Sequence, residues 1–218
     1  MNLLKDDLKR IPFLLIGFTF LSLGIVLTKR ADLGMNAWGV FHQGLSVKTG
    51  LSFGIITILF GLIVLGFSVY ILKTKIGIGT VLNVLVIGFI IDGIDYLFTF
   101  IPNTILEQYI LLLGGLVIMT FGRALYISTG LGEGPRDGLM IGLHLVFNIE
   151  IKYLKPIIEF TVLLFGYLLG GIVGIGTLVM IIVSGYLVQI YFKILNYDPK
   201  TSRQRRFIDY YNQRKNDV

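Results

Sequence analysis

Apolar residues dominate the chain in six runs that are separated by short polar segments. The runs cover residues 11–28, 53–72, 81–98, 106–128, 156–169 and 178–195. A helix needs about 20 predominantly apolar residues to cross a bilayer, and we interpret each run as one transmembrane helix. The pattern therefore predicts an all-α, polytopic transmembrane bundle with six spans.

Two shorter apolar stretches begin at helix-start signals. Residues 36–47 follow Gly34 and begin with Asn36, a residue type that caps helix N-termini well. Residues 135–147 begin with Pro135, which suits the first turn of a helix because its missing N–H would have no partner there. About a dozen residues are too few for a comfortable crossing, so we expect two short re-entrant or interfacial helices.

Three motifs of small residues occur twice at a nearly constant offset. The pairs LG and GL and the tetrapeptide GIGT lie first at residues 33–34, 44–45 and 77–80, and again at residues 131–132, 142–143 and 174–177. The offset is 98 positions for the pairs and 97 for the tetrapeptide. Motifs that recur in register are harder to obtain by chance than single glycine matches, so the pattern indicates an internal duplication.

Each copy holds three predicted spans and one short helix, and an odd number of spans makes the second copy enter the membrane from the opposite side. The distribution of Lys and Arg supports this inverted arrangement with a cytoplasmic N-terminus, because cytoplasmic loops are enriched in these residues. They gather in segments 1–10, 73–78, 129–155 and 196–218, and are absent from segments 99–105 and 170–176. The first loop is the exception, since it carries Lys29, Arg30 and Lys48.

In a second arrangement the short helices cross the membrane as well, which gives eight spans and parallel repeats. It would place Lys73 and Lys75 outside and would need spans of about a dozen residues. We therefore favour six spans, as two inverted three-span repeats in a bacterial plasma membrane, with both termini in the cytoplasm. The chain then divides into a cytoplasmic N-terminus (1–10), a first membrane repeat (11–98), a second membrane repeat (106–195) and a basic cytoplasmic tail (196–218).

Composition narrows the chemistry further. Of the 218 residues, 55% are hydrophobic and only 15% are charged, which excludes an ordinary soluble domain. The absence of cysteine excludes disulfides, thiolate metal sites and a cysteine nucleophile, and two histidines are too few for a His-rich metal site. We expect no cofactor and no enzyme activity. The net charge of +6 includes a basic tail, which we expect to face the membrane rather than nucleic acid because no recognition motif accompanies it.

The stretch 131–143 concentrates charge and glycine between apolar spans and is the first candidate binding site. Glu133, Gly134, Arg136 and Asp137 surround the predicted start of the second short helix. Free N–H groups and the positive end of the helix dipole can hold an anion there, and Arg136 adds a bidentate donor. The alternative is a surface loop in which Glu133 and Asp137 simply pair with Arg136.

Further charged residues lie within the predicted spans, where charge is costly and usually faces a partner or a cavity. Arg123 and Glu159 are candidates for substrate binding, and the alternative is an ion pair that only locks two helices together. Asp92 is a candidate for binding a coupling proton or cation, and the alternative is a wet, interfacial carboxylate. For Asp95 we favour the wet, interfacial carboxylate.

The first short helix supplies Asn36, Trp38 and His42 as polar or amphipathic candidates for the same binding site. His42 could carry a proton near neutral pH, although a lone histidine in an apolar helix is more often hydrogen-bonded structure. Trp38 is as readily an interfacial anchor as a platform for a ligand.

Three motifs resemble those of a known family. Residues 130–140 read GLGEGPRDGLM, residues 31–38 read ADLGMNAW, and GIGT opens a late span. The combination resembles the YczE-like bacterial membrane proteins, relatives of the YitT group, over nearly the whole chain. The resemblance implies a polytopic cytoplasmic-membrane protein of poorly defined biochemistry, sometimes associated with peptide-antibiotic production. Family members often carry Pro before the Trp of the first motif, where this chain has Ala37, which argues against treating both motifs as equivalent ligand sites.

The sequence favours a small secondary transporter or translocator that binds an anionic or amphiphilic solute between the two short helices, near the bilayer midplane. No ATP-binding loop is present, so energy would come from an ion gradient or from the gradient of the solute. The alternative is a non-transporting membrane partner or assembly factor for another system, which would dock through the basic tail. A wet central cavity lined by Arg123, Arg136 and Glu159 would favour transport, and a dry centre would favour the partner role. A homodimer formed through glycine faces is compatible with the sequence.

Overall fold

The computed structural model describes residues 3–199 and 201–216, which form nine helices and no strand. The helices are α1 (Leu3–Arg30), α2 (Ala37–Thr49), α3 (Phe53–Tyr70), α4 (Ile78–Leu97), α5 (Ile105–Ser128), α6 (Pro135–Phe147), α7 (Ile151–Leu168), α8 (Ile175–Ile194) and α9 (Phe207–Asn216). The prediction of an all-helical chain is confirmed.

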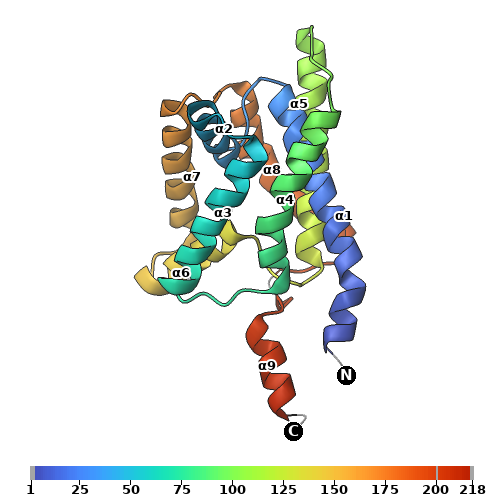
Figure 1. The fold of residues 1–218 in the computed structure, drawn as a ribbon, viewed down its shortest axis with the longest axis vertical. Helices are drawn as coiled ribbons and strands as arrows, with labels where there is room; N and C mark the ends of the chain where they lie inside the picture. The colour runs from blue at the N-terminus through green and yellow to red at the C-terminus, as the bar shows by residue number, and fades with distance from the viewer. Residues whose placement is uncertain (1–2, 200, 217–218) are drawn as a thin grey trace.

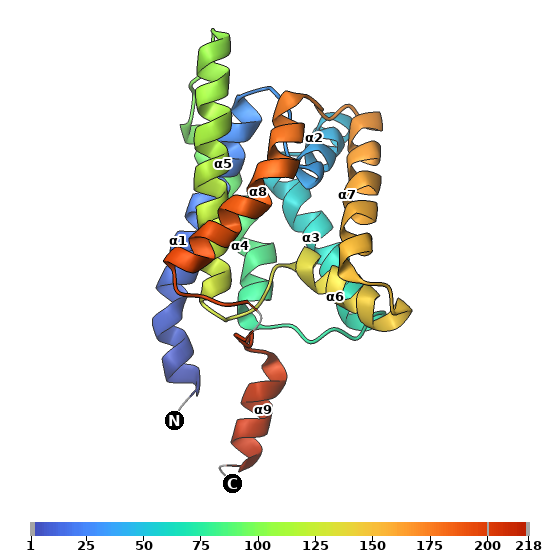
Figure 2. The same ribbon diagram turned by 180° about the vertical axis from the view of Figure 1, so that it is seen from behind.

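Long helices run between the two ends of the bundle, and the short helices α2 and α6 lie at opposite ends (Figure 1). α2 lies at the end where α1 finishes. α6 lies at the other end, together with α9 and the start of α1 (Figure 1 and Figure 2). α2 packs against α7, and α6 packs against α3. Each short helix therefore contacts a long helix from the other half of the chain.

Five helices are long and apolar enough to cross a membrane, as expected for an integral membrane protein. They are Asp6–Arg30, Phe53–Tyr70, Ile78–Leu97, Ile105–Ser128 and Ile175–Ile194. α7, which the sequence pattern makes a sixth span, has 18 residues but carries Lys152, Lys155 and Glu159. The helix also begins at Ile151, whereas the apolar run predicts a start at Pro156. The polar residues before the proline therefore belong to the helix and not to a loop.

α1 and α5 pack backbone to backbone through two pairs of glycines. A Cβ atom built on Gly24 would lie 2.5 Å from the carbonyl oxygen of Gly115, and one built on Gly122 would lie 2.7 Å from that of Gly17. Small residues allow membrane helices to approach this closely, and larger side chains would hold the helices apart. The two helices run antiparallel, as Figure 1 shows. This contact joins the two halves of the chain along one side of the bundle.

Each GIGT tetrapeptide is hydrogen-bonded to the LG pair of the other half of the chain. The N–H of Gly79 donates to the carbonyl oxygen of Leu131 at 2.8 Å, and the N–H of Gly176 donates to that of Leu33 at 2.7 Å. These donors belong to the first turns of α4 and α8, whose N–H groups have no partner within their own helix. The motifs that mark the sequence repeat therefore hold the two halves together.

Both LG pairs need glycine at the second position. Gly34 and Gly132 have φ angles of +94° and +135°, which residues with a side chain rarely adopt. A Cβ atom on Gly34 would lie 2.5 Å from Oγ1 of Thr177, and one on Gly132 would lie 2.7 Å from Oγ1 of Thr80. The turns that lead into α2 and α6 are therefore fixed against the starts of α8 and α4.

Candidate functional site

α2 and α6 begin with the same backbone geometry. Asn36 precedes α2 with φ −61° and ψ 162°, and its side-chain oxygen accepts a hydrogen bond from the N–H of Gly39 at 2.9 Å. Gly134 precedes α6 with φ −65° and ψ 158°, and Pro135 follows in the first turn. Asn36 and Gly134 are 98 positions apart, so the two short helices begin at matching positions of the sequence repeat.

The second residues of these two helices contact each other. The guanidinium carbon of Arg136, on α6, lies 4.6 Å from the centroid of the ring of Trp38, on α2. A cation over an indole ring at this distance is attracted by the negative face of the ring, with about 0.5 to 2 kcal/mol of stabilisation. The structure thus brings together one candidate residue from each short helix, again 98 positions apart.

Further charged candidates surround Arg136. Arg123, on α5, forms an ion pair with Asp137, with 3.2 Å between Nη2 and Oδ1. Glu159, on α7, forms no ion pair with Arg123 or Arg136 among the described residues, although its charge lies near enough to favour the charged form of both. The alternatives raised by the sequence pair Asp137 with Arg136 and Arg123 with Glu159. The structure instead pairs Asp137 with Arg123. Within the described part of the chain Arg136 forms no ion pair, so its N–H donors remain for a ligand.

Two polar side chains that are not among the sequence candidates lie beside Gly134. A Cβ atom there would lie 3.1 Å from the hydroxyl oxygen of Tyr126, on α5, and 3.9 Å from the side-chain nitrogen of Asn83, on α4. Asn83 is a polar residue inside an apolar span, for which the sequence predicts only a hydrogen bond across helices. A single tyrosine forms no motif, so the sequence gives no reason to select Tyr126. The neighbouring candidate Glu133 is half-buried and interacts electrostatically with Asp137.

His42 is buried one helical turn beyond Trp38. Its Nδ1 atom lies 2.9 Å from Oγ1 of Thr57, and the rings of Phe53 and Phe60 lie edge-on beside it. Its Nε2 atom has no hydrogen-bond partner among the residues that the structure describes. A purely structural role for His42, as a hydrogen-bonded residue of the core, therefore explains only one of its two ring nitrogens. That His42 carries a proton stays a prediction.

Asp92, on α4, is hydrogen-bonded to the start of α3. Its carboxylate accepts hydrogen bonds from the hydroxyl of Ser52 and from the N–H of Gly54, the latter at 2.8 Å. Asp95, one turn further on, pairs with both basic residues at the end of α1, at 2.6 and 2.8 Å. Ion coupling at Asp92 stays a prediction. In the described part of the chain no three His, Asp or Glu side chains come together as metal ligands would.

The C-terminal segment holds a residue that sequence reasoning does not find. Gln204 is buried, although it lies in the segment predicted as a basic, membrane-facing tail. Its Oε1 atom accepts a hydrogen bond from the N–H of Gly132 at 3.0 Å, and its Nε2 atom donates to the carbonyl oxygen of Ile127 at 3.1 Å. The N–H of Arg205 donates to the carbonyl oxygen of Gly130 at 2.7 Å. The tail therefore covers the loop that leads into α6.

α9 is hydrogen-bonded to the start of α1. The hydroxyl of Tyr210 donates a hydrogen bond to Oδ2 of Asp7, which is buried. Burial raises the pKa of the Tyr210 hydroxyl above its ordinary value, and the bond to the Asp7 carboxylate raises it further. The hydroxyl therefore keeps its proton, and this bond, at neutral pH.

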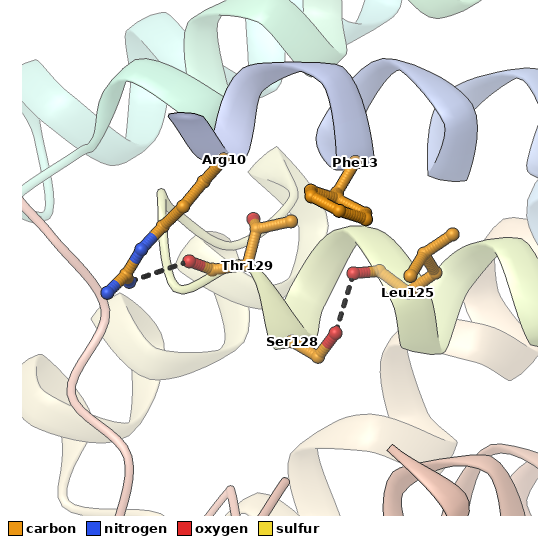
Figure 3. A pocket seen from close by; sticks show the side chains of 5 residues that line it. All are labelled: Arg10, Phe13, Leu125, Ser128 and Thr129. Carbon is orange, nitrogen blue, oxygen red and sulfur yellow. Dashed lines mark hydrogen bonds between the residues drawn. The ribbon is translucent and has the colours of Figure 1, made fainter. Parts of the chain in front are cut away.

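Two open cavities lie at the end of the bundle where α9 is found. One, of about 320 Å³, lies along α1 and α5 and is lined by Arg10, Phe13, Leu125, Ser128 and Thr129 (Figure 3). The other, of about 780 Å³, is lined by Arg10, Ser128, Gly130, Tyr197, Ser202, Arg203, Arg205, Asp209 and Asn212. Neither is lined by Arg123, Arg136 or Glu159, so neither is the wet central cavity that would favour transport, and Trp38 and Arg136 contact each other directly.

Comparison with known proteins places the chain in a family. Residues 8–193 match a family model described as a family of unknown function, DUF6198. An uncharacterized protein of Haemophilus influenzae is 35% identical over 187 residues, which cover 86% of this chain and 85% of that protein. The uncharacterized membrane protein YczE of Bacillus subtilis is 30% identical over 181 residues, which cover 83% of this chain and 84% of that protein. No solved structure matches the chain.

The matched residues include both LG pairs, both GIGT tetrapeptides and both short helices. The predicted resemblance to YczE is therefore confirmed at the level of the family. The chain is an integral membrane protein that is similar to YczE and belongs to the family of unknown function DUF6198.

Proposed function

We propose that the protein is a secondary transporter or translocator for a small anionic or amphiphilic solute. The observation that carries the proposal is the contact between Trp38 and Arg136, the second residues of two short helices from different halves of the chain. In inverted-repeat transporters, helix N-termini that meet inside the membrane bind the anionic groups of the substrate. The proposal includes no catalytic chemistry, and an ion gradient or the gradient of the solute would drive transport.

The proposed architecture is six spans in two inverted repeats, with α7 as the sixth span. The first support is a pair of hydrogen bonds, Gly79 to Leu131 and Gly176 to Leu33. The two bonds join matching positions of the sequence repeat, so each is the counterpart of the other. The second support is the packing of α2 against α7 and of α6 against α3, which are counterparts in the same way. Under the positive-inside rule the end that carries α9 faces the cytoplasm of a bacterial cell.

The guanidinium of Arg136 suits a small anion. Arg123 and Arg136 lie with the carboxylates of Asp137 and Glu159, and Glu133 lies near Asp137, so carboxylates offset the charge of both arginines before a ligand binds. Asp137 bonds to Arg123, which leaves the planar fork of Arg136 for bidentate contact with a carboxylate or a phosphate. The first N–H groups of α6 add partial positive charge. The ring of Trp38 offers an apolar face to an amphiphilic solute.

The fluorescence of Trp38 tests this proposal directly, because the chain has one tryptophan. An anion that binds Arg136 would draw the guanidinium away from the indole ring. We therefore expect the emission of the purified protein to change on titration with octanoate or with inorganic phosphate. The anion that produces the change is then tested for uptake into proteoliposomes.

Octylamine is the matched control, because it has the same number of carbon atoms as octanoate and the opposite charge. It is expected to leave the emission of Trp38 unchanged. An equal response to octanoate and octylamine, or no response to either anion, would contradict an anion site between α2 and α6. An anion response without uptake would favour the non-transporting membrane partner instead.

A further inference from the structure

We propose that the end of the bundle beside α9 binds the phosphate headgroup of an anionic phospholipid. The cavity of about 780 Å³ at this end has three arginines in its wall, Arg10, Arg203 and Arg205, together with the carboxylate of Asp209. Arginine is well suited to phosphate because its planar fork donates two parallel hydrogen bonds. This inference does not depend on the proposed transport function, because the cavity does not include Trp38 or Arg136.

The three arginines come from parts of the chain that are far apart in sequence. Arg10 lies on α1 and donates through Nη1 to the carbonyl oxygen of Thr129 at 3.0 Å, as Figure 3 shows. Arg203 and Arg205 flank Gln204, whose burial against the loop before α6 holds this segment in place. The cavity is therefore built by tertiary contacts between α1, the end of α5 and the C-terminal segment, rather than by one charged surface helix.

The existing ion pairs leave room for a phosphate. Arg203 pairs with Asp209 at 2.7 Å, but 77% of the Arg203 side chain is exposed, and such a pair contributes little to stability. A phosphate in the cavity would compete with Asp209 for the guanidinium of Arg203. Arg205 lies 3.7 Å from Oδ1 of Asp7, which is too long for a hydrogen bond and leaves its donors available.

The neighbouring cavity identifies a lipid, rather than a free phosphate, as the ligand. It shares Arg10 and Ser128 with the basic cavity and reaches Phe13 on α1 and Leu125 on α5. Figure 3 shows the side chains of Phe13 and Leu125 between α1 and α5, where both line this cavity. The Phe13 side chain is 57% exposed on a helix that is apolar enough to span the membrane. A basic cavity that adjoins apolar side chains on a membrane-spanning helix matches a phosphodiester with an attached acyl chain.

Calorimetric titration of the purified full-length protein in detergent tests the proposal. The probes are dioctanoyl-phosphatidylglycerol, dioctanoyl-phosphatidylcholine and inorganic phosphate. We expect phosphatidylglycerol to bind most tightly. Arg203→Gln is expected to weaken its binding about five-fold, the effect of one basic residue near an anionic lipid. Arg10→Gln, which alters the part shared by both cavities, is expected to weaken it at least as much.

Lys152→Gln is the matched control. Lys152 also lies in an exposed surface ion pair, with Glu150 at 2.8 Å, and it lies at the same end of the bundle but outside both cavities. It is expected to bind phosphatidylglycerol like the unaltered protein. Equal loss in Lys152→Gln and Arg203→Gln would show a general surface-charge effect and overturn the site. Equal affinity for both phospholipids, or inorganic phosphate binding as tightly as phosphatidylglycerol, would overturn the assignment to an anionic lipid.

Discussion

Alanine in place of Gly132 is expected to cost about 3 kcal/mol of stability or more. Gly132 has a φ angle of +135°, and a Cβ atom there would lie 2.7 Å from Oγ1 and 3.0 Å from the backbone nitrogen of Thr80. Backbone strain therefore adds to a clash with a neighbour that cannot easily move. Gly34, the matching position in the other half, has the same two problems against Thr177 and Gly174 and is expected to cost a similar amount. Thermal unfolding in detergent measures both.

Gly50 provides the matched control for these substitutions. Its φ angle is +74°, but nothing lies within 4 Å of a Cβ atom built on it. Alanine there should therefore cost only the strain of a left-handed backbone, about 1 kcal/mol. If Gly34→Ala and Gly132→Ala unfold at the same temperature as Gly50→Ala, the contacts between each LG pair and the opposite GIGT tetrapeptide do not hold the two halves together.

Glutamine in place of Arg136 is expected to lower the affinity for anions by about ten-fold to a hundred-fold and to abolish uptake in proteoliposomes. The substitution removes a charged, bidentate donor, and hydrogen bonds to charged groups contribute about 1.5 to 3 kcal/mol each. It also removes the cation from the ring of Trp38, so the emission of the unliganded protein should change as well. Titration with octanoate, followed through Trp38, measures the affinity.

Two further substitutions show whether the loss is specific. Arg136→Lys keeps the charge but not the fork, so it is expected to retain part of the affinity. Lys75→Gln removes one positive charge from an exposed position between α3 and α4 and is expected to leave the affinity unchanged. Octanoate binding that survives in Arg136→Gln, or that falls equally in Lys75→Gln, would remove Arg136 from the site.

The helices could be predicted from the sequence where local chemistry marks their ends. For the second short helix, the predicted limits 135–147 are those of α6. Pro135 needs no N–H partner in the first turn, and Asn148 ends the helix with a left-handed φ of 53°. For α1 the apolar run predicts 11–28, whereas the helix covers Leu3–Arg30. Hydropathy marks the part of a helix that suits a bilayer, and polar residues can extend the helix beyond it.

The contacts of the candidate site could not be predicted in the same way. The sequence repeat makes Trp38 and Arg136 matching positions, but hydrophobic periodicity does not say that matching positions touch. The partner of Arg123 is Asp137 rather than Glu159, and Asp137 lies just past the loop that joins α5 to α6. Gln204 lies in a charged segment with no periodic pattern, so nothing in its neighbourhood predicts its burial.

Cysteine labelling shows whether α2 and α6 enter the membrane from opposite faces. The chain has no native cysteine, so Lys48→Cys, at the end of α2, and Lys152→Cys, just past α6, each carry one reactive site. Asn103→Cys, in the loop between α4 and α5, marks one face as a reference. Intact bacteria that express each variant are treated with a maleimide that does not cross the membrane.

We expect the cysteines at positions 48 and 103 to be labelled in intact cells and the cysteine at position 152 to be labelled only after the cells are opened. That result places the ends of the two short helices on opposite sides of the membrane. If the cysteines at positions 48 and 152 react from the same side, the short helices cross the membrane in parallel repeats. The binding site between two opposed helix starts would then be ruled out.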